Sequence, residues 1–285
     1  MNNKFFKELC ILIVSYESEK KINLLIKNIS KSISILIVEN SRDFKLKSKI
    51  EKKFKNVNVL IPKDNLGFAN SLNIATKKIK KKYIMYLDSD VNIKTKGIYK
   101  LLTEAKKVER FGAITPKIYK QNYKDLITKK NKNGMHEVSY NTGCVMLFKT
   151  EILKKMNYFD NSFFLYFEEI DYYKRCIKAK YPIFMYDKVT ITHGQSASID
   201  VELRDEYRKI RNWHYCWSKF FYYKKHFGYL TGLSKTLPNI IKSIKKILIC
   251  ILKLEFKKIP FFYAELEGLF CSYLNIRPFY RIKKS

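Results

Sequence analysis

The stretch YIMYLDSD at residues 83–90 organises this 285-residue chain. Its first five residues are apolar or aromatic, and a run of this kind between polar flanks predicts a buried strand. Two carboxylates, Asp88 and Asp90, follow at once with Ser89 between them. Open α/β sheets bind ligands at the carboxyl ends of their strands, and paired carboxylates there offer hard oxygen ligands for Mg²⁺ or Mn²⁺. The alternative is an ordinary turn, because Asp and Ser are frequent after strands.

Three more apolar runs precede this stretch. We predict strands at residues 9–14 (LCILIV), 34–38 (SILIV) and 57–61, with segments of helical periodicity between them. Strands that are apolar throughout and alternate with helices indicate an α/β fold with a mainly parallel sheet flanked by helices. One rim of that sheet would then carry the polar residues that follow the strands: Ser15, Tyr16, Glu17, Glu39, Asp88, Ser89 and Asp90.

The helix that precedes residues 83–90 opens with Asn65, Leu66, Gly67 and, one turn later, Asn70. A helix start of this kind can present backbone N–H groups to a phosphate or a sugar. It can equally be a helix cap and turn with no ligand. Both interpretations stay open at this point.

The C-terminal side of the stretch continues the alternation. We expect a helix near residues 98–109, strands at 112–118, 138–148 and 163–167, a loop at 119–137, and a strand pair at 181–192. The strand at 163–167 runs directly into Glu168, Glu169 and Asp171. Acidic residues in this position can simply stabilise the start of a helix through its dipole.

The chain carries a formal net charge of +31. Only eight of its 57 basic residues are Arg, whereas proteins that read nucleic-acid sequence use Arg for two-pronged contacts with bases. We therefore expect an anionic membrane surface rather than nucleic acid as the partner of this charge. The six cysteines are scattered without paired spacing, which favours a reducing compartment, and no stretch approaches the roughly 20 apolar residues of a membrane span. The first apolar run is followed at once by polar residues, so we interpret it as a strand rather than a signal peptide.

Seven motifs occur in an order that resembles glycosyltransferase family 2, the inverting enzymes of GT-A fold, and most closely their rhamnosyltransferase-like branch. They are VSYE (14–17), VENS (38–41), NLGFANSLN (65–73), LDSD (87–90), NTGCVMLFK (141–149), FFLYFEEIDYYKR (163–175) and THGQSAS (192–198). The resemblance spans roughly residues 8–225.

The resemblance implies a division of labour among these residues. Asp88 and Asp90 would hold the metal and the ribose-diphosphate end of a nucleotide-sugar donor, and His193 would complete the metal shell. Glu169 occupies the position of the usual catalytic base, and Asp171 could be a base or a structural acceptor. The donor would be a UDP- or dTDP-sugar, with rhamnose as one candidate sugar, and the acceptor a lipid-linked or saccharide chain in cell-surface polysaccharide synthesis.

The sequence departs from the family pattern at several of these positions. Glu169 stands where the family base is usually Asp, so its carboxylate lies about one methylene further along the side chain. Glu39 also replaces the commoner Asp, and Leu66 and Ala69 replace Gly residues often found there.

We expect a catalytic domain over residues 1–225, with a donor half at about 1–118 and an acceptor half at about 138–225, followed by a basic helical region at 226–285. A stripe of apolar residues at i, i+3 and i+4 spacing, flanked by Lys, runs from 240 to 252. Such a helix is typical of membrane surfaces, and would place the protein in the cytoplasm on the inner face of the cell membrane. The alternative is a helix that packs on the catalytic domain.

Two other functions remain compatible with the residues alone. One is a nucleotidyltransferase of similar α/β form, although a Gly-rich phosphate loop after the first strand is lacking. The other is a non-enzymatic basic module that binds membranes or nucleic acid.

Overall fold

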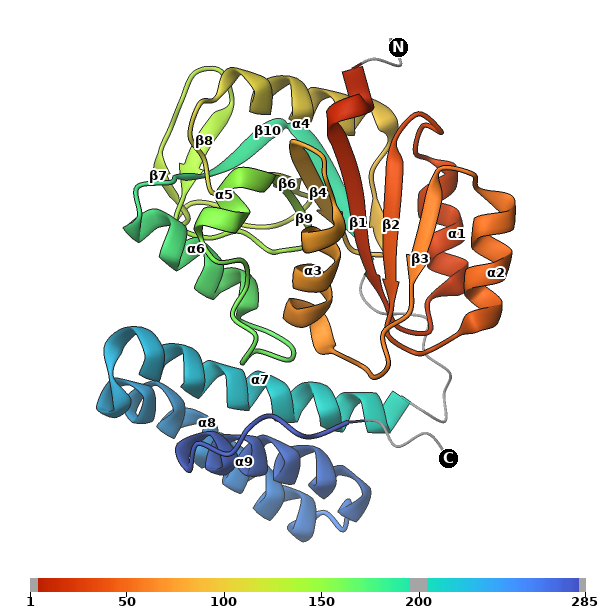
Figure 1. Ribbon diagram of the computed structural model, residues 1–285. Coiled ribbons are helices and arrows are strands. Elements are labelled where there is room, and N and C mark those ends of the chain that lie inside the picture. The colour runs from red at the N-terminus through yellow and green to blue at the C-terminus, as the bar shows by residue number, and fades with distance from the viewer. Residues whose placement is uncertain (1–4, 195–203, 282–285) are drawn as a thin grey trace. The chain divides into compact units, whose positions relative to one another are not determined.

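The protein is described here by a computed structural model that places residues 5–194 and 204–281 (Figure 1). Its contacts divide the chain into two compact units, each described separately below. The α/β unit comprises Met1–Asp160 and Glu169–Ala197, and the helical unit comprises Asn161–Glu168 and Ser198–Ser285.

Ten strands of the described residues form one sheet in the α/β unit. They are β1 (Leu9–Ser15), β2 (Ser34–Glu39), β3 (Val57–Leu60), β4 (Tyr83–Leu87), β5 (Val91–Asn92), β6 (Ala113–Ile118), β7 (Ile127–Lys129), β8 (Met135–Val138), β9 (Val145–Lys149) and β10 (Ile183–His193). The order is β3-β2-β1-β4-β9-β6-β10-β8-β7, and β5 pairs with β10.

The first four strands of that order run parallel, and antiparallel β9 joins them to the rest of the sheet. Because β1 is the neighbour of both β2 and β4, the carboxyl ends of these three strands meet at one rim. Ser15 is in register with Glu39 across β1 and β2. This confirms the predicted α/β fold with a mainly parallel core and the predicted rim.

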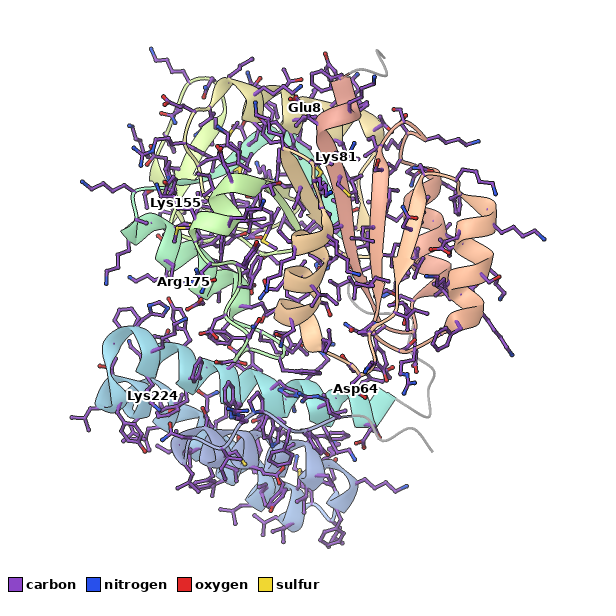
Figure 2. The ribbon with its side chains drawn as sticks, in the orientation of Figure 1. Glu8, Asp64, Lys81, Lys155, Arg175 and Lys224 are labelled. Atoms are coloured by element: carbon purple, nitrogen blue, oxygen red, sulfur yellow. The ribbon has the colours of Figure 1, made fainter. Side chains whose placement is uncertain are left out.

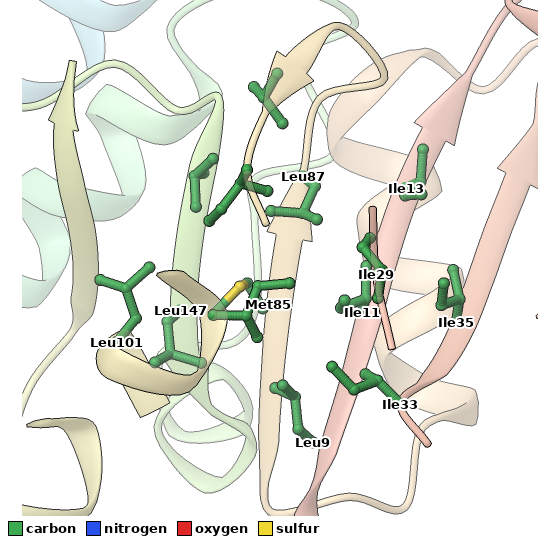
Figure 3. Close-up of a cluster of buried hydrophobic side chains, with 14 of the residues drawn as sticks. Leu9, Ile11, Ile13, Ile29, Ile33, Ile35, Met85, Leu87, Leu101 and Leu147 are labelled. Atoms are coloured by element: carbon green, nitrogen blue, oxygen red, sulfur yellow. The ribbon is translucent and has the colours of Figure 1, made fainter. Parts of the chain in front are cut away.

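Six α-helices cover the sheet within the described part of this unit: α1 (Glu19–Lys27), α2 (Phe44–Lys53), α3 (Gly67–Lys78), α4 (Thr95–Lys107), α5 (Thr150–Lys155) and α6 (Glu168–Lys178), preceded by the 3₁₀ turn η1 (Phe5–Glu8). The apolar sides of α1, α2 and α4 pack in one cluster with alternate residues of β1, namely Leu9, Ile11 and Ile13. Figure 3 labels these three residues and Leu101 of α4. On the opposite face lie α3, α5 and α6 (Figure 1). Burial on both faces explains why these strands read as unbroken apolar runs.

Three sequence predictions for this part of the chain were wrong. The expected strand pair at 181–192 is the single strand β10, with an irregularity between Tyr186 and Thr190. The expected loop at 119–137 contains β7 and most of β8, which pair with each other as an antiparallel hairpin. The expected strand at 163–167 is an irregular turn, because Tyr166 and Phe167 adopt φ angles of +69° and +68°, which no strand accommodates. Its aromatic residues belong to the helical unit.

The helical unit consists of α7 (Arg204–Phe227), α8 (Tyr229–Leu252), the 3₁₀ turn η2 (Phe256–Lys258) and α9 (Ile259–Tyr273). Aromatic residues of α7 form its core: Trp213 and Trp217 pack with Ala264 of α9, and Phe220 packs with Leu269. The irregular turn joins this core through Phe163, whose ring lies 5.1 Å from that of Phe221.

The aromatic side of α7 is buried by residues of α8 and α9, so α7 belongs to the helical unit. None of the helices within the described residues is both long enough and apolar enough to cross a membrane.

Candidate active site

The candidate site begins at the turn that follows β4. The N–H of Asp88 donates to the Cys144 carbonyl at 2.8 Å, so pairing with the β9 side of the sheet continues one residue past the strand. The Asp88 carbonyl then accepts from Val91 N–H at 3.3 Å, which closes a tight turn through Ser89 and Asp90. The two carboxylates are therefore held at the rim by backbone hydrogen bonds.

Strand β10 brings His193 to this turn. His193 pairs with Val91 across β5 and β10, and Gly194 N–H donates to the Asp90 carbonyl at 3.1 Å. The His193 Nε2 atom lies 3.1 Å from an Asp88 carboxylate oxygen and 3.0 Å from one of Asp90. Ligand atoms of these three residues all lie within 4.8 Å of one another. The structure thus assembles the three residues predicted to hold a metal; the last residues of their motif, 195–198, lie outside the described residues.

The charges at this cluster favour a cation. Hydrogen bonds to Asp88 and then Asp90 raise the pKa of His193 to about 10. Burial opposes ionisation of Asp90, but the hydrogen bond from His193, its charge and that of Lys21 bring the pKa of Asp90 below its usual value. Two carboxylate oxygens and one imidazole nitrogen form an oxygen-rich set that suits Mg²⁺ or Mn²⁺. The residues present therefore fit such an ion.

Sequence reasoning missed two residues that touch the carboxylates. The Tyr86 hydroxyl donates to Asp88, and Lys21 Nζ of α1 lies 3.6 Å from an Asp90 carboxylate oxygen. Tyr86 could have been found, because residues two apart in a strand share a face and Tyr86 precedes Asp88 by two. Lys21 carries no such signal, because nothing in the sequence distinguishes it from its neighbour Lys20.

Glu169, the predicted base, lies in the first turn of α6 and is half-buried. Loss of solvation, and secondarily the charge of Asp88, raise the pKa of Glu169 to about 7. Gly143 lies against it: a Cβ atom at Gly143 would sit 3.0 Å from the Glu169 Cγ. The next residue, Cys144, bonds Asp88, so one short segment positions both the base and the first carboxylate.

Asp171 occupies a different environment from Glu169. Its carboxylate is fully buried and accepts from Arg175 Nε at 2.8 Å, one helical turn away. Arg175, labelled in Figure 2, also donates to the carbonyls of Met156 and Tyr158. The pair therefore clamps the chain after α5, where Tyr158 has a φ of +58°. This arrangement favours the structural-acceptor interpretation of Asp171.

The ends of β1 and β2 are joined by side-chain hydrogen bonds. Ser15 Oγ donates to one Glu39 carboxylate oxygen at 2.5 Å, and the N–H of Ser41 donates to the other at 2.8 Å. Glu39 has no exposed surface. Next to them Tyr16 is half-buried, and Glu17 is exposed with a φ of +49°. These predicted donor-binding residues share the rim with Asp88, as expected.

At the start of α3 two backbone N–H groups donate to side chains of the protein. Gly67, with a φ of +71°, donates to the Asn65 side chain at 3.0 Å, and Leu66 donates to the side chain of Asn40 at 3.4 Å. Asn70 in turn donates to the Leu66 carbonyl at 3.3 Å. Of the two interpretations left open, this geometry favours the cap and turn.

These features can be set against known proteins. A profile described as Glycosyl transferase family 2 matches residues 10–172, more than half of the chain. The chain belongs to glycosyl transferase family 2. The matched region includes Asp88, Asp90 and Glu169, whereas His193 lies beyond it. Membership favours the glycosyltransferase hypothesis over a nucleotidyltransferase or a non-enzymatic module. No curated protein is significantly similar to the chain in sequence.

Solved structures share the fold at low sequence identity. The mannosyltransferase PcManGT from Pyrobaculum calidifontis, in complex with GDP-Man and Mn²⁺, is 10% identical with a TM-score of 0.59 over 94% of this chain and 87% of that one. S. aureus TarS 1–349 with UDP-GlcNAc is 16% identical, with a TM-score of 0.52 over 94% and 90%. GalNAc-T7 with UDP, GalNAc and Mn²⁺ is 13% identical, with a TM-score of 0.55 over 78% of this chain. The match covers about half, 52%, of GalNAc-T7.

Proposed function

We propose that this protein is a metal-dependent, inverting glycosyltransferase. It transfers a sugar from a UDP- or dTDP-sugar, with rhamnose as a candidate, to a lipid-linked or saccharide acceptor in cell-surface polysaccharide synthesis. The observation that carries the proposal is the convergence of Asp88, Asp90 and His193 at the rim that also carries Glu169. Support comes from the structural neighbours, whose complexes contain GDP-Man, UDP-GlcNAc or UDP, in two cases with Mn²⁺.

The proposed reaction is a single displacement at the anomeric carbon. Glu169 takes the proton of the acceptor hydroxyl as that oxygen attacks, and a pKa of about 7 lets it do so at neutral pH. Asp88, Asp90 and His193 would hold Mg²⁺ or Mn²⁺, and a bound divalent ion supplies positive charge beside the leaving diphosphate. A single carboxylate base with no covalent intermediate inverts the configuration of the transferred sugar.

We assign donor binding to about residues 1–118, through the rim residues Ser15, Tyr16, Glu17, Glu39 and Ser89, whereas Asn65, Gly67 and Asn70 form the cap and turn that opens α3. The uridine or thymidine base is what the resemblance to the rhamnosyltransferase-like branch implies. We further propose that the enzyme works on the inner face of the cell membrane. In support, all six cysteines are free thiols, as a reducing compartment favours, and the net charge is +31.

The test is donor turnover by the purified chain. The protein is incubated with a panel of UDP-, dTDP- and GDP-sugars, with Mn²⁺, Mg²⁺ or chelator, and the nucleotide released is identified by mass spectrometry. We expect turnover of one donor class, loss of turnover in chelator, and loss on Glu169→Gln but not on Glu109→Gln, an exposed glutamate outside the site. Full turnover in chelator would exclude the metal-dependent mechanism. In a second incubation with a saccharide acceptor, the anomeric proton of the glycoside formed, read by NMR, decides between inversion and retention.

A further inference from the structure

Helix α8 of the helical unit leaves a row of large apolar side chains in water. The row, here called the α8 apolar face, consists of Leu230, Leu237, Ile241, Ile244, Leu248 and Leu252. Their exposed fractions run from 46% at Ile244 to 83% at Leu252. At 100° per residue all six fall within an arc of about 80°, so they form one continuous strip along the helix. Soluble proteins rarely leave a contiguous apolar strip of this length uncovered.

The opposite side of α8 is already occupied. It carries the small residues Gly232, Thr236, Ser243 and Cys250, all buried. A Cβ atom at Gly232 would lie 2.7 Å from the Phe220 ring of α7, and Ser243 Oγ donates to Glu265 of α9 at 2.6 Å. Turning the apolar face inward would break this close packing. The face is therefore a stable outer surface of the helical unit.

The charged side chains along α8 are all basic. Lys235, Lys242 and Lys245 are exposed and lie on the arc next to the apolar face, and α8 contains no Asp or Glu. Beyond its end the pattern continues, with exposed Leu254 and Phe256 beside exposed Lys residues. The other flank of the apolar face carries Ile240, which packs against the core of the unit.

We propose that the α8 apolar face is the surface by which this protein docks on an anionic lipid bilayer. The helix lies in the plane of the interface, with the Leu and Ile side chains among the acyl chains and the lysines at the phosphate level. Charge complementarity selects this occupant: two copies of a face bordered by lysines repel each other, whereas anionic head groups attract it. The predicted stripe at 240–252 thus divides, with Ile240 packed inside and Ile241, Ile244, Leu248 and Leu252 facing outward.

The proposal names the surface that attaches the protein to the inner face of the cell membrane. It rests on that location and not on the proposed transferase activity. Vesicle binding needs no sugar donor, so it can fail while donor turnover succeeds, and the reverse. The test is flotation of the full chain with vesicles of phosphatidylcholine containing 30% phosphatidylglycerol, and with vesicles of phosphatidylcholine alone. We expect binding to the first and at least tenfold weaker binding to the second.

Two sets of substitutions separate the apolar and the ionic contributions. Ile241→Ser with Leu248→Ser should weaken binding at least tenfold at any salt concentration. Its control is Leu24→Ser with Phe44→Ser, two equally exposed side chains of the α/β unit, which should leave binding unchanged. Both variants alter exposed positions, and their thermal unfolding should match that of the parent protein.

Lys235, Lys242 and Lys245 changed together to Gln should weaken binding at low salt by about fivefold for each lysine, and much less at high salt. The control is the same change at three exposed lysines of the α/β unit, Lys27, Lys31 and Lys52. Insertion itself is read by Leu248→Trp, whose fluorescence brominated lipids should quench, whereas Leu24→Trp should be insensitive.

Three results would overturn the proposal. The first is unchanged vesicle binding by the variant with serine at 241 and 248, and the second is equal quenching at positions 248 and 24. The third is a stable dimer in light scattering that Ile241→Ser with Leu248→Ser dissociates, because a second copy of the chain would then cover the face.

Discussion

The rim of the α/β unit and the outer face of α8 deal with water in opposite ways. At the rim, polar groups are buried and paired: Glu39 has no exposed surface and accepts from Ser15 and Ser41. On α8, apolar groups are exposed without a cover, as at Leu252, which is 83% exposed. Burying a polar group costs free energy unless it is hydrogen-bonded, and exposing a large apolar strip costs free energy unless something covers it. The two regions therefore point to two different functions, chemistry at the rim and attachment at α8.

The contrast between the two regions would fail most clearly if the rim lost a carboxylate and sugar transfer continued. Asp90→Asn should reduce sugar transfer by about three orders of magnitude, because a metal contributes several kcal/mol of charge stabilisation to the transition state. Vesicle binding should not change, since α8 is untouched. Turnover and flotation measured on the same preparation check both statements, and circular dichroism shows whether the fold survives. Normal turnover by this variant would remove the Asp pair from the mechanism.

A second change at the rim tests the base. Glu169→Gln keeps the size of the side chain but removes the proton acceptor, so transfer should fall by about 10²–10³-fold while donor binding, measured by calorimetry, is spared. In the parent protein the raised pKa of Glu169 means that the basic form accumulates as pH rises through about 7. The rate should therefore increase from pH 6 to pH 8 and then level off. A flat profile over that range would argue for a different base.

Asp171 offers a test of fold against chemistry within the same helix. Asp171→Asn removes the buried partner of Arg175, which is itself partly exposed, so unfolding free energy should drop by about 2 kcal/mol. Transfer per folded molecule should fall less than tenfold. Chemical denaturation gives the first quantity, and turnover normalised to folded protein gives the second. If this variant lost transfer while Glu169→Gln remained active, Asp171 would be the base and Glu169 would not.

Sequence alone predicted the sheet rim well because buried parallel strands are apolar throughout and their ends are marked by polar residues, as at Asp88. It also predicted that His193 completes the cluster, but through a family resemblance. The paired residues of β5 and β10 lie about 100 positions apart in the chain, so their pairing has no local signal. The aromatic run at 163–167 was misassigned as a strand. Its composition suits a strand. The positive φ angles of Tyr166 and Phe167 exclude one, and they go with tertiary packing against α7 that the sequence does not reveal.

For α8 the sequence predicted the apolar stripe but not which of its residues are exposed. Periodicity identified an apolar stripe, but a stripe does not tell which of its residues face protein and which face outward. The small residues Gly232, Thr236 and Ser243 decide this, because they allow close approach of α7 and α9 on their side alone. Small residues at helical spacing opposite a stripe are the signal that could have been used.

Expressed as free energy, the smallest expected effect comes from Gly143, because a tenfold loss of rate corresponds to about 1.4 kcal/mol. At this position rim geometry can be disturbed without removing any functional group. In Gly143→Ala the new methyl carbon would lie 3.0 Å from the Glu169 Cγ and 3.1 Å from its Cβ, so the base must shift by a few tenths of an ångström. We expect kcat to fall about tenfold, because the catalytic proton transfer depends on position, while the KM for the donor changes little. Gly97→Ala is the matched control: the three atoms nearest its methyl carbon would belong to Ile93 and Val189, at 3.3–3.7 Å, rather than to a carboxylate of the site. Equal kinetics for the two variants would show that Gly143 does not position Glu169. The segment at 143–144 would then position only Asp88, through the hydrogen bond to the Cys144 carbonyl.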